Sequence, residues 1–174
     1  DLDLSVIDEL PPGRTPVATY LVGEDKRRRL HGFVRKQVAQ GRQVYIVCPA
    51  VDQEDQAGMK AAQQYGRSLQ EEVFPDLRVA IVHGKLRPKE KQAVMASFVA
   101  GQTDVLVSTT VIEVGVDVPN ANLMVIENAE RFGLSQLHQL RGRVGRGSAQ
   151  SYCVLVSGTK NEETKKRLQA LCKT

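Results

Sequence analysis

Residues 136–147 contain a glutamine followed by three arginines, in the sequence QLHQLRGRVGRG. On an α-helix, which turns by about 100° per residue, Gln139, Arg143 and Arg146 lie within about 60° of one another. A guanidinium group is planar, always charged and able to donate two hydrogen bonds at once to phosphate oxygens. The spacing therefore predicts a polar helix face on which Arg143 and Arg146 present guanidinium groups to a polyphosphate, beside Gln139.

The opposite face of this predicted helix is apolar and is expected to pack on a sheet; it carries Leu134, Leu137, Leu140 and Val144. Gly142 and Gly145 would each cost about 0.8–1 kcal/mol relative to alanine in a helix interior. Their presence is explained if another group approaches the backbone closely at these positions. The alternative is a solvated basic helix, the commoner fate of arginine-rich segments, which glycines at this spacing fit poorly.

A second candidate segment, residues 108–119, begins at the end of an apolar run and reads STTVIEVGVDVP. The hydroxyl groups of Thr109 and Thr110 at a strand end can donate hydrogen bonds to phosphate oxygens. Asp117, just beyond Gly115, can accept a hydrogen bond from a ribose hydroxyl. An ordinary turn capped by Asp117 explains the same residues equally well, so this segment alone leaves both interpretations open.

Gly84 and Lys85 follow another strand-like run and resemble the end of a phosphate-binding loop, but Leu86 stands where that loop requires serine or threonine. No Walker A sequence occurs anywhere in the chain. Asp8 and Glu9 are a poor magnesium-binding pair, because a Pro-Pro loop follows them and no buried strand precedes them. The chain has phosphate donors without a nucleotide cradle or a metal ligand, so we expect it to hold half of an ATP site.

These candidate residues belong to a chain of alternating strand-like and helix-like segments. Apolar runs predict strands at residues 16–22, 44–48, 79–82, 104–108, 123–126 and 152–156. Helical patterns occupy residues 26–40, 59–73 and 88–101, then the arginine segment and a C-terminal helix that includes residues 167–174. Short apolar strands separated by helices are typical of an α/β fold with a parallel sheet covered on both faces. Such sheets bind ligands at the carboxyl ends of their strands, where the candidate segments are expected to converge.

The composition is that of an ordinary soluble globular domain. Of the 174 residues, 41% are hydrophobic and 25% are charged, and no apolar run approaches the roughly 20 residues needed to cross a bilayer. The net charge of +4 permits nucleic-acid binding, and the absence of Trp argues against a base-stacking platform for single strands. For the basic run 26–29 we favour a solvated helix face over a phosphate contact.

The cysteines and histidines indicate neither disulfides nor a metal site. Cys48 and Cys153 lie in apolar strand-like runs, which suggests buried, reduced thiols and a cytosolic compartment. The histidines lack metal-ligand spacing with the cysteines, so a zinc site is not expected. Residues 1–14, which include Pro-Pro-Gly, look like a connecting segment, and residues 15–174 are expected to form one domain cut from a larger protein.

In this order the segments resemble the second RecA-like lobe of superfamily 2 helicases. Residues 109–117 resemble motif V of that superfamily, and residues 139–146 resemble motif VI. The longer run 127–147 resembles the RecG group of ATP-dependent DNA helicases more specifically. Residues 5–14 resemble the segment that joins the two motor lobes in that group.

The transcription-repair coupling factors are the nearest alternative to the RecG group, since they have a similar arginine segment. His138 and Glu127 favour the RecG group, because the coupling factors tend to have tyrosine at the histidine position. Leu140 occupies a position where many superfamily 2 members carry arginine, and this also fits the RecG group.

The resemblance implies a RecA-like three-layer α/β fold with a mainly parallel central sheet and helices on both faces. It implies that Arg143 and Arg146 are arginine fingers, which reach the γ-phosphate of ATP across the interface between lobes. Gln139 would help to place them. Arg141 points elsewhere on the helix projection and is expected to have a structural role.

Further roles follow from the same resemblance. Gly115 and Asp117 would border the ribose and phosphates of the nucleotide. Contacts to the DNA backbone would come from the ends of two strands, at Thr109, Thr110, Gly84 and Lys85.

The resemblance also implies the partners of this domain. ATP with Mg²⁺ is the expected cofactor, with the magnesium ligands on a first RecA-like lobe outside this chain. Branched or forked DNA, that first lobe and a wedge domain of the same protein are the expected partners, in the bacterial cytoplasm and away from any membrane. Without Walker A and Walker B sequences the isolated chain is expected to be inactive. The alternative is a non-enzymatic module that uses its basic face for nucleic acid alone.

Overall fold

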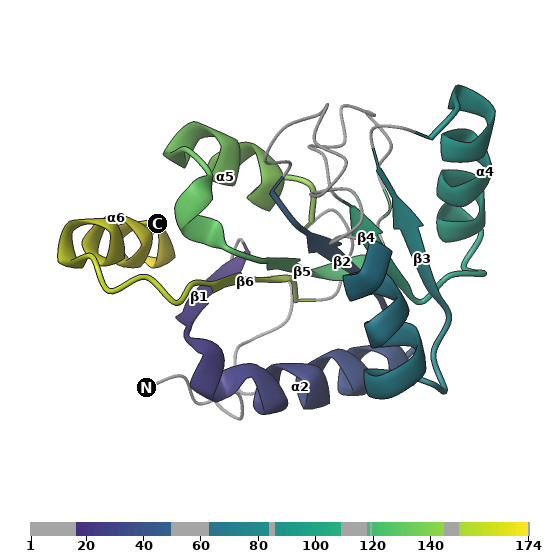
Figure 1. Ribbon diagram of the computed structural model, residues 1–174, viewed down its shortest axis with the longest axis horizontal. Coiled ribbons are helices and arrows are strands. Elements are labelled where there is room, and N and C mark those ends of the chain that lie inside the picture. Colours follow the sequence, from purple (N-terminus) through teal and green to yellow (C-terminus); the bar gives the residue numbers. More distant parts are fainter. Residues whose placement is uncertain are drawn as a thin grey trace.

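The computed structural model describes residues 17–49, 63–83, 86–108, 118, 120–144 and 150–173, which form one sheet between layers of helices (Figure 1). The strands are β1 (Ala18–Val22), β2 (Gln43–Val47), β3 (Val79–Val82), β4 (Val105–Ser108), β5 (Ala121–Ile126) and β6 (Tyr152–Val156). They lie in the order β1-β6-β5-β2-β4-β3, and every neighbouring pair is parallel. The predicted parallel sheet is confirmed.

Alternate residues of each central strand point to opposite faces of the sheet, so each face has its own hydrophobic core. In β2, Val44 and Ile46 belong to one core, whereas Tyr45 and Val47 belong to the other. Every residue of this strand is buried. A strand that is buried on both faces has no polar side, which explains why residues 44–47, after Gln43 at the start of the strand, form a continuous apolar run rather than an alternating one.

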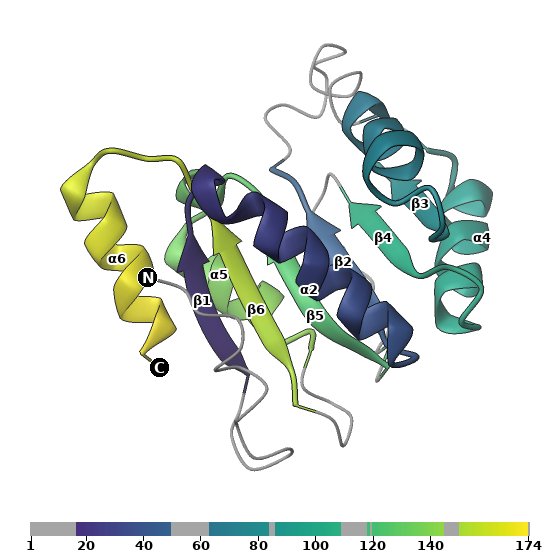
Figure 2. The same cartoon turned by 90° about the horizontal axis from the view of Figure 1, so that it is seen from below.

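Helices cover both faces, which gives the three layers expected of a RecA-like fold (Figures 1 and 2). One face is covered by α2 (Arg27–Ala39) and by helical residues 63–68, which continue into the π-helical turn η2 (Leu69–Val73). The other face is covered by α4 (Pro88–Val99), α5 (Leu134–Arg141) and α6 (Glu162–Cys172). Short 3₁₀ turns, η1 (Glu24–Lys26) and η3 (Ala129–Arg131), precede α2 and α5.

Glycine and proline residues mark the ends of two helices as the sequence predicts. Gly41 and Gly101 follow α2 and α4 with φ angles of 84° and 79°, in the left-handed region that glycine adopts without a Cβ clash. Pro88 is the first residue of α4, where its missing amide hydrogen is not needed. These residues set the lengths of two helices that connect parallel strands.

The helix expected over residues 59–73 ends differently from the prediction. It is described from residue 63, and it closes with a wide turn in which the Phe74 amide donates to the Leu69 carbonyl at 2.6 Å. This bond spans five residues, as in a π-helix. Leu69 and Phe74 are consequently both in the core, with 2% and 0% exposure.

The C-terminal helix also has different bounds from the predicted ones. Its first turn begins at Glu162, because the Asn161 side chain accepts a hydrogen bond from the Thr164 amide at 3.0 Å and so caps the helix. The helix ends at Cys172. Its residues Leu168 and Leu171 are buried against the sheet.

The three cysteines are free, and burial explains their chemistry. Cys153 is buried as predicted, whereas Cys48 is half-buried. Burial raises the pKa of both thiols to about 12 and that of Cys172 to about 11. All three thiols are therefore neutral at physiological pH.

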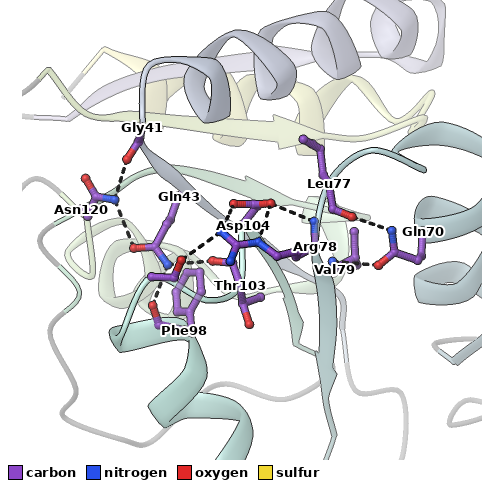
Figure 3. A network of polar contacts seen from close by, with 11 residues as sticks. Gly41, Gln43, Gln70, Leu77, Arg78, Val79, Phe98, Thr103, Asp104 and Asn120 are labelled. Atoms are coloured by element: carbon purple, nitrogen blue, oxygen red, sulfur yellow. Dashed lines mark hydrogen bonds and ion pairs between the residues drawn. The ribbon is translucent and has the colours of Figure 1, made fainter.

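Side-chain hydrogen bonds close the amino edge of the sheet, where β2, β3 and β4 begin (Figure 3). The buried Gln43 amide nitrogen donates to the carbonyls of Phe98 and Thr103 at 2.6 and 2.8 Å. Nearby, Arg78 Nη2 forms an ion pair with Asp104 at 2.9 Å. Contacts within the chain thus occupy this part of the amino edge.

Replacing Gln43 with Leu is expected to lower the free energy of unfolding by about 1–3 kcal/mol, because the Thr103 carbonyl loses a donor and Asn120 loses an acceptor. Urea unfolding followed by circular dichroism measures this change. Gln102 is exposed, so Gln102→Leu is the matched control at the surface. Equal stability of the two variants would show that the network at the amino edge does not hold the strands.

Candidate functional site

The carboxyl ends of parallel strands meet at one edge of the sheet, which is where ligands bind in folds of this kind. In the described part of the chain, the residues that directly follow strands at this edge are Gly23, Cys48, His83, Glu127 and Ser157. β4 ends at Ser108, directly before the candidate segment 109–117. The candidate site is therefore built from this edge and from α5, which follows β5.

α5 packs on the sheet through the apolar side chains that the sequence predicts, with one exception. Leu137, Leu140 and Val144 are buried, with 0%, 3% and 3% exposure. The expectation that Leu134 shares this face is wrong, since its side chain is 41% exposed. Leu134 is the first residue of the helix, one turn before the buried Leu137.

Arg141 and Arg143 do not share one continuous α-helix, so the prediction of a helix that runs through Arg143 is wrong. α5 ends at Arg141, and the amides of Arg143 and Val144 donate to the carbonyls three residues before them, at 3.0 and 3.4 Å. Such bonds tighten the turn relative to an α-helix, and glycine at position 142 has a low helix propensity. The buried Val144 anchors the turn to the core. Arg143 on this turn is half-buried, and Gln139 on the last turn of α5 is exposed.

Gly142 is not required by the fold of the described chain. It is exposed, and its φ angle of −69° is accessible to any residue. A Cβ at this position would meet only the carbonyl oxygens of His138 and Gln139, both at an ordinary contact distance of 3.5 Å. The predicted close approach of another group to Gly142 stays a prediction.

Arg141 has the structural role that its place on the helix projection indicates. Its Nη1 donates to the Leu171 carbonyl at 3.0 Å and lies 3.4 Å from the Thr19 hydroxyl. Its Nη2 lies 3.3 Å from Nδ1 of His138. Arg141 thus joins the end of α5 to the end of α6 and to the amino half of β1, which confirms the prediction.

The contact with Thr19 also shows where the arginine segment lies. The segment leaves the carboxyl edge after β5, but its last turn reaches the amino half of β1, because Thr19 is the second residue of that strand. The expected convergence of all candidate segments at the carboxyl edge is therefore wrong for the end of α5. Arg143 belongs to the face of the domain that carries α5.

Several predicted site residues lie outside the described residues, and their roles stay predictions: Gly84, Lys85, Thr109, Thr110, Gly115, Asp117 and Arg146. The described residues beside them indicate where these segments begin and end. The Ser108 carbonyl accepts a hydrogen bond from the Cys48 amide at 2.7 Å, which holds the start of segment 109–117 at the carboxyl edge. Val118, directly after that segment, is buried in the same core as Leu140 and Val144. Val118 therefore lies on the face that carries α5.

The structure adds an ion pair at the carboxyl edge that the sequence does not reveal. Arg27 donates to both carboxylate oxygens of Glu127, at 2.8 and 2.7 Å. The expectation of a solvated helix face for residues 26–29 is therefore wrong for Arg27, although Arg28 and Arg29 are exposed. The paired residues are 100 positions apart in the chain, so no local pattern could indicate the contact. The one available signal is an acidic residue directly after a buried strand.

Residues 25–148 match the family model of the helicase conserved C-terminal domain. The chain belongs to this family. The matched residues include α5, the turn with Arg143 and every residue predicted for the site.

Individual relatives are more specific. The chain is 54% identical over 168 residues, 97% of its length, to the ATP-dependent DNA helicase RecG of Synechocystis sp.. It is 53% identical over 169 residues to the RecG of Thermotoga maritima, again over 97% of its length. It spans only 20% and 22% of the length of these two relatives.

A solved structure gives the same result for the fold. A structure of RecG bound to a three-way DNA junction matches 94% of the chain with a TM-score of 0.78 and 49% identity, and the chain covers 21% of it. The predicted resemblance to the RecG group and the predicted RecA-like fold are confirmed.

The described donors suit an anion rather than a cation. Among the described residues, no group of three or more His, Cys, Asp or Glu side chains could hold a metal ion. Within the same ranges no helix is long and apolar enough to cross a membrane. Arg143 and Gln139 offer guanidinium and amide hydrogens, which fit the phosphate oxygens of a nucleotide.

Replacing Arg141 with Met is expected to lower the free energy of unfolding by about 1–3 kcal/mol, because the Leu171 carbonyl loses a charged donor while the apolar stem is retained. Hydrogen exchange measured by mass spectrometry should accelerate in α6 more than in β2 and β5. Arg167→Met, at an exposed position of α6, is the control. Unchanged exchange in α6 would contradict the structural role of Arg141.

Proposed function

We propose that this domain is the second motor lobe of an ATP-dependent DNA helicase or translocase of the RecG type. More than half of its residues are identical to those of two RecG proteins over nearly the whole chain. The observation that carries the proposal is the placement of Gln139 and Arg143 on a helix and turn that buried Leu140 and Val144 anchor to the core. An anchored turn of this kind can present a guanidinium group in one fixed position.

The position of Arg143 supports a role toward a nucleotide held by another domain. A nucleotide bound by this chain alone would lie in the crevice at the carboxyl edge, as in other open α/β sheets. Arg143 lies instead on the α5 face, two residues beyond Arg141, whose guanidinium contacts the amino half of β1. An arginine finger acts in this way, across the boundary between two domains.

ATP with Mg²⁺ would supply the phosphoanhydride bond and the metal ion, and the metal ligands would lie on the first lobe. Arg143, with Arg146 as the second predicted finger, would donate hydrogen bonds to γ-phosphate oxygens as negative charge spreads over them during transfer to water. Gln139 would orient these guanidinium groups. Gly115 and Asp117 would border the ribose and phosphates, from the segment directly before Val118, which lies on the same face as α5.

Forked or branched DNA is the proposed substrate, with roles in replication-fork remodelling, recombination and repair. The matching RecG structure is bound to a three-way DNA junction. The predicted backbone contacts of this chain follow the carboxyl ends of β3 and β4, which are neighbours in the sheet: Gly84, Lys85, Thr109 and Thr110. Neighbouring strands would bring hydroxyl, amide and ammonium donors to adjacent phosphates of one strand of DNA.

The chain spans only about a fifth of the length of its relatives, so the proposed protein has further domains of the RecG type. Residues 1–14 would connect this lobe, residues 15–174, to a first RecA-like lobe that carries the Walker A and Walker B sequences. A wedge domain of the same protein would recognise the branch of the DNA. The proposed location is the bacterial cytoplasm, as for the bacterial proteins that this chain resembles.

The isolated chain of 174 residues is expected not to hydrolyse ATP, with or without DNA, because the Mg²⁺ ligands and the phosphate loop belong to the first lobe. Phosphate release from the purified chain, compared with the full-length protein at equal concentration, measures this. DNA-dependent hydrolysis by the isolated chain would contradict the proposed division between lobes.

Replacing Arg143 with Ala in the full-length protein is expected to lower kcat for DNA-stimulated ATP hydrolysis by about 10³-fold, since an arginine finger is worth about 10³–10⁵ in turnover. Affinity for a DNA fork should stay within about twofold, because the guanidinium contacts the nucleotide and not the DNA. Phosphate release and fluorescence anisotropy measure the two quantities separately. Arg28→Ala, at an exposed position of α2, is the control and should change neither. Lost DNA affinity with unchanged ATP hydrolysis would instead support a non-enzymatic nucleic-acid-binding module.

A further inference from the structure

A carboxylate, a guanidinium and a phenol meet at the carboxyl edge of the sheet. Glu127, directly after β5, accepts hydrogen bonds from Nη1 and Nη2 of Arg27 at 2.8 and 2.7 Å. The Tyr65 hydroxyl donates to the same carboxylate. Arg27 also pairs with Glu24, at 2.7 Å from Nε. The Glu127 side chain is only 8% exposed, whereas that of Glu24 is 65% exposed, so the inner carboxylate is the confined one.

Arg27 and Tyr65 both keep their protons in this cluster. Hydrogen bonds to Glu127 and Glu24 raise the pKa of Arg27 above its ordinary value, although burial opposes this. Burial raises the pKa of Tyr65, and the negative charge of Glu127 raises it further. Tyr65 therefore stays protonated and remains a donor, and Arg27 stays charged. Three donor atoms from two helical segments thus hold one carboxylate in place.

Glu127 is also the last residue held by the sheet before the chain crosses to α5. Its amide donates to the Val47 carbonyl at 2.8 Å, which continues the pairing of β5 with β2. Asn128 then adopts a left-handed conformation, with φ of 49°, and the chain turns through η3 toward α5. A second contact on this path is the Glu130 carboxylate, which accepts from the Ser157 hydroxyl at 2.6 Å. Glu127 therefore lies at the point where this connection leaves the sheet.

The cluster connects the two faces of the domain. Arg27 and the helical residues around Tyr65 lie on the face covered by α2, whereas α5 lies on the opposite face. The connection to α5 thus begins at Glu127, a residue whose side chain is held by groups on the other face of the sheet. An eight-residue helix with buried Leu137 and Leu140 transmits such a position to its other end, because it moves as one body.

We propose that Glu127 is a positioning residue for ATP hydrolysis: held by Arg27 and Tyr65, it sets the position of α5 and thereby of Gln139 and Arg143. This inference rests on the proposed function. It concerns placement alone, since the Glu127 carboxylate accepts hydrogen bonds from Arg27 and Tyr65 within the domain. Displacement of a catalytic group by about 1 Å can lower a rate by about 10²-fold, so a loosened anchor is measurable in turnover.

Glu127→Gln is the first variant to test, in the full-length protein. An amide has one acceptor oxygen, so it cannot accept both guanidinium bonds and the phenol bond, and its NH₂ group faces a donor. We expect kcat to fall about tenfold, with KM for ATP and affinity for a DNA fork within about twofold of the parent protein. Tyr65→Phe removes one donor without changing charge, and it should lower kcat by a smaller factor in the same direction.

Glu24→Gln is the matched control, because it removes an equal charge from the solvent side of Arg27 and leaves the connection to α5 untouched. Its kcat should equal that of the parent protein. Thermal melting of each variant accompanies the assays. A merely structural role predicts lower melting temperatures with an unchanged kcat for every variant that is fully folded at the assay temperature, and that result would overturn the proposal.

The combination with Arg143→Ala separates this inference from the proposed function. If Glu127 acts through Arg143, the double variant should hydrolyse ATP no more slowly than Arg143→Ala alone. Losses that multiply would show that Glu127 acts elsewhere and would refute the positioning role. If Arg143→Ala itself leaves ATP hydrolysis intact, the proposed function fails. If Arg143→Ala is inactive while Glu127→Gln and Tyr65→Phe match the parent protein, only the positioning role fails.

Discussion

The parallel arrangement of the described strands is the constraint on which the rest of the molecule depends. Since β1 to β6 all run in one direction, every strand ends at the same edge of the sheet. Each connection must therefore return over one face of the sheet to the amino edge before the next strand can begin. The two edges consequently differ. Side chains such as Gln43 and Asp104 close the amino edge through hydrogen bonds within the chain. At the carboxyl edge, polar residues such as Glu127 and Ser157 follow the strands and face the starts of the connections.

A charged residue at that edge imposes a second constraint. The carboxylate of Glu127 lies between the layers, where leaving it unpaired would cost several kcal/mol. Its partners must therefore come from neighbouring elements, and here they come from α2 and the helical segment with Tyr65. Pairing requires these elements to keep one position relative to β5. The buried Glu127 carboxylate thus links the α2 face to the connection that leads to α5.

The elements of the fold could largely be predicted from the sequence because their signals are local. Strands β2 and β5 contain continuous apolar runs, at residues 44–47 and 123–126, and Gly41 and Pro88 mark helix ends through backbone geometry alone. The site was less predictable because its geometry is not local. After Arg141, each backbone amide can donate either to the carbonyl four residues before it, as in an α-helix, or to the carbonyl three residues before it. The spacing of apolar residues in the sequence does not decide between these two hydrogen bonds. The partner of Arg27 lies across the fold, so a basic run gave no sign of it.

The end of α5 separates two arginines that the sequence places only two residues apart. Arg141, the last helical residue, turns inward to the Leu171 carbonyl and the Thr19 hydroxyl and so joins α5 to α6 and β1. Arg143 follows on the tightened turn, which buried Val144 holds against the core. Because the helix ends between them, the Arg141 guanidinium contacts other elements of the domain, and Arg143 lies on a short turn anchored by Val144. With Glu127 at the start of the connection and Arg141 at its end, the segment that bears Gln139 has a paired charged group at each end, and Arg143 follows two residues beyond it.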